Sequence, residues 1–180
     1  MKSQKAGFTL IELMIVITLV GIIGTITTQV FLINVRSQNK SEIVKEVKQN
    51  GDYASAAMEI MIRNAIDVPS LQCNAQAADQ LTITNQDGNS TTFDCSDDIK
   101  IASISSTFPS LPQSLTSSKV KVTGCFFKII CPTPPLSPKY VYMGFRVCQT
   151  GDDPCPGGTN FSVDTRASLE YETTVTLRNY

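Results

Sequence analysis

A single carboxylate lies inside a long apolar stretch near the amino terminus. Glu12 is the only ionisable residue in the run from Phe8 to Ile33, and this run exceeds the roughly 18 to 20 apolar residues that cross the hydrocarbon core of a bilayer. A carboxylate well inside a membrane span costs about 2.5 to 3.5 kcal/mol on insertion scales. Because no basic residue adjoins Glu12, the pattern predicts a partner for this charge elsewhere, such as on another chain.

The six cysteines are the other residues that could do chemistry. They are Cys73, Cys95, Cys125, Cys131, Cys148 and Cys155. An even number of cysteines confined to the carboxyl-terminal part of a chain is typical of disulfides formed in an oxidising compartment. A zinc site is a poor alternative, because the chain has no histidine and no Cys-x-x-Cys pair. We therefore expect disulfides and no metal site.

The first cysteine pair that we expect is Cys73 with Cys95. Residues 81–84 and 91–95 read as two short strands, and the turn between them contains Asp-Gly, a strong hairpin signal. Because these cysteines flank the hairpin, its strands would bring them together. The sequence thus favours this bond over the many other pairings that six cysteines allow.

The other four cysteines leave alternatives open. Cys148 could pair with Cys155 in the following loop or with Cys125 on the neighbouring strand. A bond between Cys125 and Cys131 has a geometric problem, because a continuous strand would separate them by about 20 Å, beyond the bridging limit of about 7 Å. The pattern alone does not decide among the rest.

A long helix is expected to position both the carboxylate and the head. After residue 41 the apolar positions recur at helical spacing among charged ones, so the helix continues beyond the membrane run. The apolar positions are Ile43, Val47, Ala54, Met58, Met61 and Ala65. We expect the helix to span residues 8–67, with a bend or a close packing contact at Gly51 and an end before Pro69.

The rest of the chain reads as short strands and turns. Residues 120–130 and 140–148 are expected to form an antiparallel pair separated by prolines, and residues 107–118 read as a connecting loop. Residues 169–177 alternate between apolar and polar side chains, as a strand with one buried face does. Together the elements predict an α+β fold in which a long amino-terminal helix packs on an antiparallel sheet.

Composition excludes several function classes. The chain carries 15 basic and 16 acidic residues with no basic cluster, so strong nucleic-acid binding is not expected. It lacks histidine, the commonest general base, and it has no nucleophile elbow, phosphate loop or dinucleotide fingerprint. We expect neither an enzyme nor a bound cofactor.

The residues Gly7-Phe8-Thr9-Leu10-Ile11-Glu12 resemble the processing site of type IV pilins and of the pseudopilins of type II secretion and DNA uptake. The resemblance implies that a prepilin peptidase cuts after Gly7 and methylates Phe8. It also implies that Glu12 faces the new amino terminus of a neighbouring subunit and so guides filament assembly. Residues 173–179 are more weakly similar to the last strand of some minor pilin-like subunits.

The resemblance also implies an organisation of the chain. Residues 1–7 would be a leader, residues 8–33 the transmembrane and filament-core helix, residues 34–67 its amphipathic continuation, and residues 68–180 the head. The expected partners are the peptidase, other pilin or pseudopilin subunits, an inner-membrane assembly platform and the lipid bilayer. We expect a single-pass membrane protein with its head outside the cytoplasm, later part of a filament. The alternatives are a pseudopilin of a secretion or DNA-uptake machine and a membrane-anchored adhesin or receptor that does not polymerise.

The membrane run departs from many pilins, because it has no proline in its second half. Its weak helix formers are Gly21, Gly24, Thr25, Thr27 and Thr28. These residues could let the helix loosen in a filament, or they could let membrane helices pack closely. The sequence supports both interpretations equally.

Overall fold

The computed structural model describes residues 7–69, 73, 76–97, 99–107, 111–131, 138–150, 155 and 167–177. The chain divides into two compact units, Met1–Lys40 and Ser41–Tyr180. Within the described residues, one helix and seven strands follow in this order: α1 (Leu10–Arg63), β1 (Gln80–Thr84), β2 (Ser90–Asp94), β3 (Ala102–Ser105), β4 (Gln113–Ser114), β5 (Val120–Ile130), β6 (Tyr140–Gln149) and β7 (Ser168–Thr176). The predicted α+β class is confirmed.

The end of α1 differs from the prediction. The helix ends at Arg63 and not near Asp67, because the backbone after it pairs with β1. The amide of Ile66 donates to the carbonyl of Thr84 at 2.8 Å, and the amide of Thr84 donates to the carbonyl of Asp67 at 2.8 Å. Sheet-like bonds thus replace the helical bonds about one turn before Pro69.

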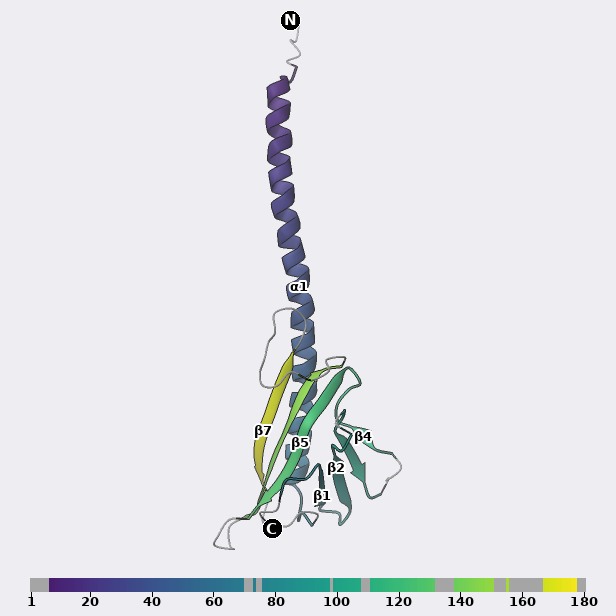
Figure 1. Cartoon of the computed structure of the whole chain (residues 1–180). Coiled ribbons are helices and arrows are strands. Elements are labelled where there is room, and N and C mark those ends of the chain that lie inside the picture. Colours follow the sequence, from purple (N-terminus) through teal and green to yellow (C-terminus); the bar gives the residue numbers. More distant parts are fainter. Residues whose placement is uncertain are drawn as a thin grey trace, which may run out of the picture. The chain divides into compact units, whose positions relative to one another are not determined.

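The second half of α1 packs on the head through a stripe at helical spacing. Its buried residues are Val47, Gly51, Ala54, Met58 and Ile62. Apart from Gly51, these residues join one core with the inward side chains of both sheets. Figure 1 shows this part of α1 running along the three-stranded sheet β5-β6-β7.

Gly51 marks a close contact and not a bend. The helix continues through this position, and a Cβ built on Gly51 would overlap the ring of Tyr171 on β7. The hydroxyl of Tyr171 donates to Oδ1 of Asp52 at 2.9 Å and to the carbonyl of Lys48 at 3.2 Å. Its ring stacks on Phe145 with the centroids 5.2 Å apart. Glycine therefore lets β7 approach the helix at this level.

The contact at Tyr171 predicts how the stability of the head depends on pH. Burial, followed by the hydrogen bond to Asp52, raises the pKa of the Tyr171 hydroxyl well above its ordinary range. The stabilisation from this group is therefore fully present below about pH 10, where an unfolded tyrosine titrates, and it is lost as the pH rises through the folded-state pKa.

We expect the free energy of unfolding of a soluble fragment, Ser41–Tyr180, to fall above about pH 10. The substitution Tyr171→Phe should reduce the slope of this decline in denaturant titrations at successive pH values. The control is Tyr53→Phe, since Tyr53 is 62% exposed and the slope should not change. Equal slopes for Tyr171→Phe and the wild type would show that this hydroxyl is not the titrating group.

The strands form two antiparallel sheets, where the sequence suggested one. The predicted hairpin of β1 and β2 is confirmed, with Gln80 opposite Asp94 and Thr84 opposite Ser90. Gly88 in its turn has a φ of 79°, a left-handed conformation that glycine adopts without strain. Strands β3 and β4 extend this sheet, so the region from 107 to 118 is not wholly a loop.

The second sheet is β5-β6-β7, also antiparallel. A β-bulge between Thr123 and Phe126 interrupts β5, where Gly124 has a φ of 61°. The two sheets meet along this strand: Ala78 and Phe127 form an isolated bridge, and the rings of Phe93 and Phe127 lie 6.4 Å apart. The core of the head lies between these sheets and α1.

The three disulfides are Cys73–Cys131, Cys95–Cys125 and Cys148–Cys155. The predicted bond between Cys73 and Cys95 is wrong. The backbone position opposite Cys95 belongs to Asp79, whose carbonyl accepts from the Cys95 amide at 3.0 Å. Ala78 already pairs with β5, so the preceding chain leads Cys73 away from the hairpin.

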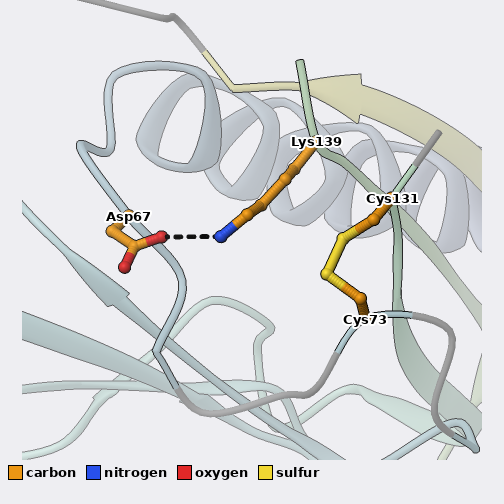
Figure 2. The surroundings of a disulfide bond; sticks show 4 residues. All are labelled: Asp67, Cys73, Cys131 and Lys139. Carbon is orange, nitrogen blue, oxygen red and sulfur yellow. Dashed lines mark hydrogen bonds and ion pairs between the residues drawn. A yellow bond between two sulfur atoms is a disulfide. The ribbon is translucent and has the colours of Figure 1, made fainter. Parts of the chain in front are cut away.

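Cys73 instead joins the end of β5 through Cys131, and Cys95 joins the bulge through Cys125 (Figure 2 shows the first of these bonds). Near the Cys73 bond, Nζ of Lys139 lies 3.4 Å from Oδ1 of Asp67. Two disulfides therefore tie the first sheet and the segment before it to β5.

Of the two partners that the sequence left open for Cys148, the structure pairs it with Cys155. Cys148 is completely buried, and Val141, Met143 and Val147 of β6 lie in the core. On β7 the predicted face is also inward, since Val175 is buried while Glu170 is exposed.

Candidate functional site

The residues that resemble a processing site lie at the start of α1. Gly7 is exposed, Phe8 is 83% exposed, and the helix begins at Leu10. Residues 1–6 of the predicted leader lie outside the described residues. The peptide bond between Gly7 and Phe8 therefore precedes the first helical residue and joins two exposed residues.

The fold itself does not require a glycine at position 7. A Cβ built on Gly7 meets no atom within 4 Å. At Gly51, by contrast, a side chain would collide with the head. The described residues therefore leave room for a side chain at position 7.

Thr9 caps the helix, which the sequence analysis did not foresee. The amide of Glu12 donates to Oγ1 of Thr9 at 3.4 Å, and the amide of Leu13 donates to the Thr9 carbonyl at 3.2 Å. The spacing Thr9-x-x-Glu12 is that of a capping box, so a sequence signal for this role was present.

Capping of the helix is a second explanation for Glu12, beside a partner on another chain. The free energies of the two effects can be compared. An acidic residue in the first turn of a helix gains about 0.3 to 1 kcal/mol from the helix dipole. The cost of a carboxylate in a membrane span is about 2.5 to 3.5 kcal/mol. The helix terminus thus offsets only part of this cost, and Glu12 still needs a partner if it enters the bilayer.

The first half of α1 presents apolar side chains on every side. The helix is long and apolar enough to cross a membrane, and no part of its most apolar stretch is buried within the chain. Exposed residues include Leu13, Ile17, Ile22, Val30 and Phe31. An apolar surface this large is covered by lipid or by other helices in a stable protein.

The threonines of this segment do not leave unpaired hydroxyls. Each of Thr18, Thr25, Thr27 and Thr28 donates to a backbone carbonyl three or four residues earlier, at distances of 2.8 to 3.1 Å. The helix is continuous through them. In the isolated chain, these weak helix formers therefore do not interrupt the helix.

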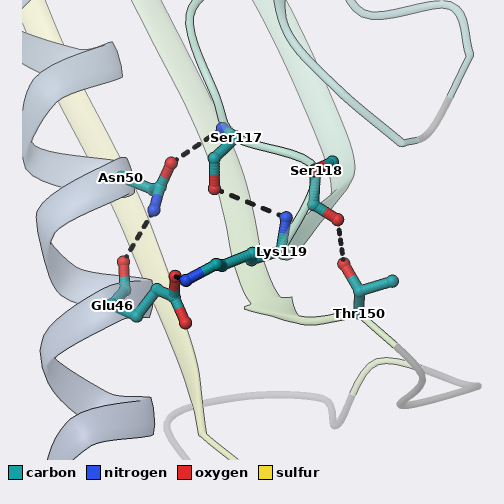
Figure 3. A network of polar contacts seen from close by, with 6 residues as sticks. All are labelled: Glu46, Asn50, Ser117, Ser118, Lys119 and Thr150. Atoms are coloured by element: carbon teal, nitrogen blue, oxygen red, sulfur yellow. Dashed lines mark hydrogen bonds and ion pairs between the residues drawn. The ribbon is translucent and has the colours of Figure 1, made fainter.

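Polar contacts hold one loop of the head on α1 (Figure 3). The amide of Ser117 donates to Oδ1 of Asn50 at 2.8 Å, and Nζ of Lys119 lies 3.0 Å from Oε1 of Glu46. The hydrogen bond with Glu46 raises the pKa of the Lys119 ammonium. The ion pair is exposed and contributes little to stability, so this cluster positions a loop and offers no chemistry.

Among the residues that the structure describes, no group of three or more histidine, cysteine, aspartate or glutamate side chains could hold a metal ion. All six cysteines are in disulfides.

The family comparison concerns the start of the chain. Residues 2–28 match the prokaryotic N-terminal methylation motif, whereas no curated protein and no solved structure matches the chain. This motif belongs to a family of structural subunits that a prepilin peptidase processes and that assemble with other pilins. Together with the apolar helix, it indicates membrane anchoring. The match at the amino-terminal segment supports a type IV pilin-like protein.

Proposed function

We propose that the chain is a structural subunit, a minor pilin, of a type IV pilus-like filament, which it enters through α1. A prepilin peptidase would cleave between Gly7 and Phe8 and methylate the new terminus at Phe8. The observation that carries the proposal is the methylation motif at residues 2–28. It coincides with an exposed Gly7–Phe8 pair and with a helix whose most apolar part is not buried within the chain.

Cleavage supplies the partner that Glu12 lacks. It creates an ammonium group on Phe8, close to the start of the helix, which in a bundle of helices can face the Glu12 carboxylate of a neighbour. Opposite charges attract far more strongly in a low dielectric than in water, but removing both from water offsets much of the gain. The pair would therefore set the register of the subunits more than it stabilises the filament.

The head would lie outside the cytoplasm. Its three disulfides support this orientation, because disulfides form and persist in oxidising compartments. In this arrangement the short leader stays on the cytoplasmic side and the apolar run of α1 crosses the bilayer. An inner-membrane assembly platform would then move the processed subunit into the filament.

The nearest alternative is a pseudopilin of type II secretion or DNA uptake, which shares the same processing and the same helix. The more distant one is a membrane-anchored adhesin or receptor that never polymerises. The methylation motif favours the polymerising proteins over the adhesin, since an anchor alone needs neither a methylated terminus nor an intramembrane acid.

The substitution Glu12→Gln separates the assembly of the subunit into filaments from its insertion in the membrane. A neutral amide is easier to bury than a carboxylate, so Glu12→Gln should enter the membrane at least as well as the wild type. Its content in sheared filaments should fall, because the ammonium of the neighbour loses its counter-charge. Immunoblots of membrane and sheared fractions measure both quantities.

The control variant is Glu42→Gln, which makes the same exchange at an exposed position of α1 beyond the span. It should assemble like the wild type. Equal amounts of Glu12→Gln and wild type in the filament fraction would refute the pairing of Glu12 with a neighbouring terminus.

A further inference from the structure

Two polar side chains in the apolar run of α1 lack a hydrogen-bond partner among the described residues. Glu12 is one of them, and Gln29 is the other. The threonine oxygens are all engaged: Thr9 accepts from a backbone amide, and Thr18, Thr25, Thr27 and Thr28 donate to carbonyls. Gln29 is exposed on the helix surface within the segment that is apolar enough to span a membrane.

An unpaired carboxamide is unfavourable in hydrocarbon. Transfer of an amide from water to a solvent that cannot hydrogen-bond costs about 4 to 8 kcal/mol. The group offers two donors and an acceptor oxygen, so its partial charges are complementary to those of a second carboxamide. Each of two facing Gln29 carboxamides can donate one N–H to the oxygen of the other, so the same residue of another copy supplies both a donor and an acceptor.

The surface around Gln29 permits another helix to approach closely. A shallow groove on α1 is lined by Gln29 together with Val20, Gly21, Gly24, Thr25 and Thr28. Gly21, Thr25 and Gln29 follow one another at intervals of four residues, as do Gly24 and Thr28, which places them on one side of the helix. Small residues at this spacing let the backbones of two membrane helices come near each other.

The two glycines of the groove have no packing role among the residues that the structure describes. A Cβ built on Gly21 or Gly24 meets no atom within 4 Å, whereas one built on Gly51 would overlap Tyr171. A glycine inside a helix costs about 1 kcal/mol relative to alanine. Gly21 and Gly24 thus each destabilise the helix without making a contact among the described residues. A close contact with another helix would explain why glycine occupies both positions.

We propose that two copies of this chain pair in the membrane as parallel helices through the groove, with the Gln29 carboxamides hydrogen-bonded to each other across a two-fold axis. A two-fold contact uses the same surface on both copies and brings identical residues to the same depth. The inference depends on the membrane anchoring in the proposed function and on neither processing nor filament assembly. It describes the subunit in the bilayer before assembly.

Cysteine cross-linking tests this pairing in the full-length chain. All native cysteines lie beyond residue 70 and are in disulfides, so an introduced cysteine is the single free thiol. The chain is expressed in a bacterial membrane without filament machinery, treated with a mild oxidant and analysed on a non-reducing gel. Thr28→Cys, in the groove, should give a cross-linked dimer. Val30→Cys, at nearly the same depth on the opposite side of the helix, should not.

The role of Gln29 is tested in the Thr28→Cys background. Gln29→Leu should lower the association constant, read from the dimer fraction at several expression levels, by about tenfold, as expected for the loss of interhelical hydrogen bonds. Gly21→Ile should abolish the dimer by filling the groove. Thr27→Val, which removes a hydroxyl already bonded within the helix, should leave the dimer unchanged.

Carbonate extraction of each membrane sample separates the outcomes. A chain that is extracted as a soluble protein refutes membrane anchoring, and the pairing with it. A chain that stays in the membrane but cross-links equally at positions 28 and 30, or equally with and without Gln29, refutes the pairing alone. Cross-linking that appears only when other pilins are added also refutes it, because the occupant is then a different chain.

Discussion

Replacing Cys73 and Cys131 together by serine is expected to lower the free energy of unfolding of the head by about 4 kcal/mol, the entropic stabilisation of a loop of this length. The bond joins residues 58 positions apart, whereas Cys95–Cys125 and Cys148–Cys155 span 30 and 7. Because the stabilisation grows with loop length, removal of these two bonds should cost about 3.5 and about 2.5 kcal/mol. Each loss is large against a domain stability of about 5 to 15 kcal/mol.

Combinations of single substitutions test the connectivity. Cys73→Ser with Cys131→Ser should destabilise the fragment Ser41–Tyr180 no more than either alone, since both break one bond. Cys73→Ser with Cys95→Ser should give the sum of two losses, because these cysteines belong to different bonds. Denaturant titration provides the free energies, and thiol labelling should find no free thiol in the wild type. This connectivity would be contradicted if the losses from Cys73→Ser and Cys131→Ser were additive while the losses from Cys73→Ser and Cys95→Ser were not.

Substitution of Gly7 by arginine is expected to block maturation almost completely. The position is open in the folded chain, so Gly7→Arg should leave the head folded and the helix in the membrane. A large charged side chain directly before the cleaved bond should prevent entry into the peptidase. The protein should keep its leader, run slower than the processed chain on a gel, and be missing from sheared filaments.

The control is Gly7→Ala, which keeps a small residue at the same position. It should be processed far more than Gly7→Arg. If Gly7→Arg is cleaved as well as the wild type, the motif is not a processing site. If Gly7→Arg is uncleaved and also unfolded, as shown by loss of the disulfides, then position 7 has a role in the fold. This result would contradict the inference drawn from the open surroundings of Gly7.

The long-range organisation of the fold was accessible from the sequence because its signals are local. The change from a uniformly apolar run to apolar residues at helical spacing located the two parts of α1. The alternation of apolar and polar residues in 169–177 located β7 and its inward face. The Asp-Gly turn located the first hairpin. By contrast, β3 is rich in serine and β4 has two residues, so neither carries a hydrophobic pattern.

The disulfide pairing was not accessible, because it depends on how distant elements meet. The flanks of a hairpin suggested Cys73 with Cys95, but the bridge between Ala78 and Phe127 turns the chain toward β5 before the hairpin begins. The bulge after Thr123 then places Cys125 beside Cys95. Neither feature can be read from the residues near either cysteine.

The candidate site was largely visible in the sequence, although parts of it were overlooked. Glu12 and Gly7 were identified from residue type and position, and the Thr9 cap has its own spacing signal. Gln29 was also visible as a polar residue in an apolar run. It became informative only when the structure showed that the neighbouring threonines satisfy their own hydroxyls.

The most direct test of the central claim is the mass of the amino terminus of the wild-type protein. The protein is extracted from membranes of its native host, where the peptidase is present, and its amino-terminal peptide is analysed by mass spectrometry. The proposed function predicts a chain that begins at Phe8 and carries a methyl group on its terminal nitrogen. A chain that begins at Met1, with residues 1–7 intact, would contradict it.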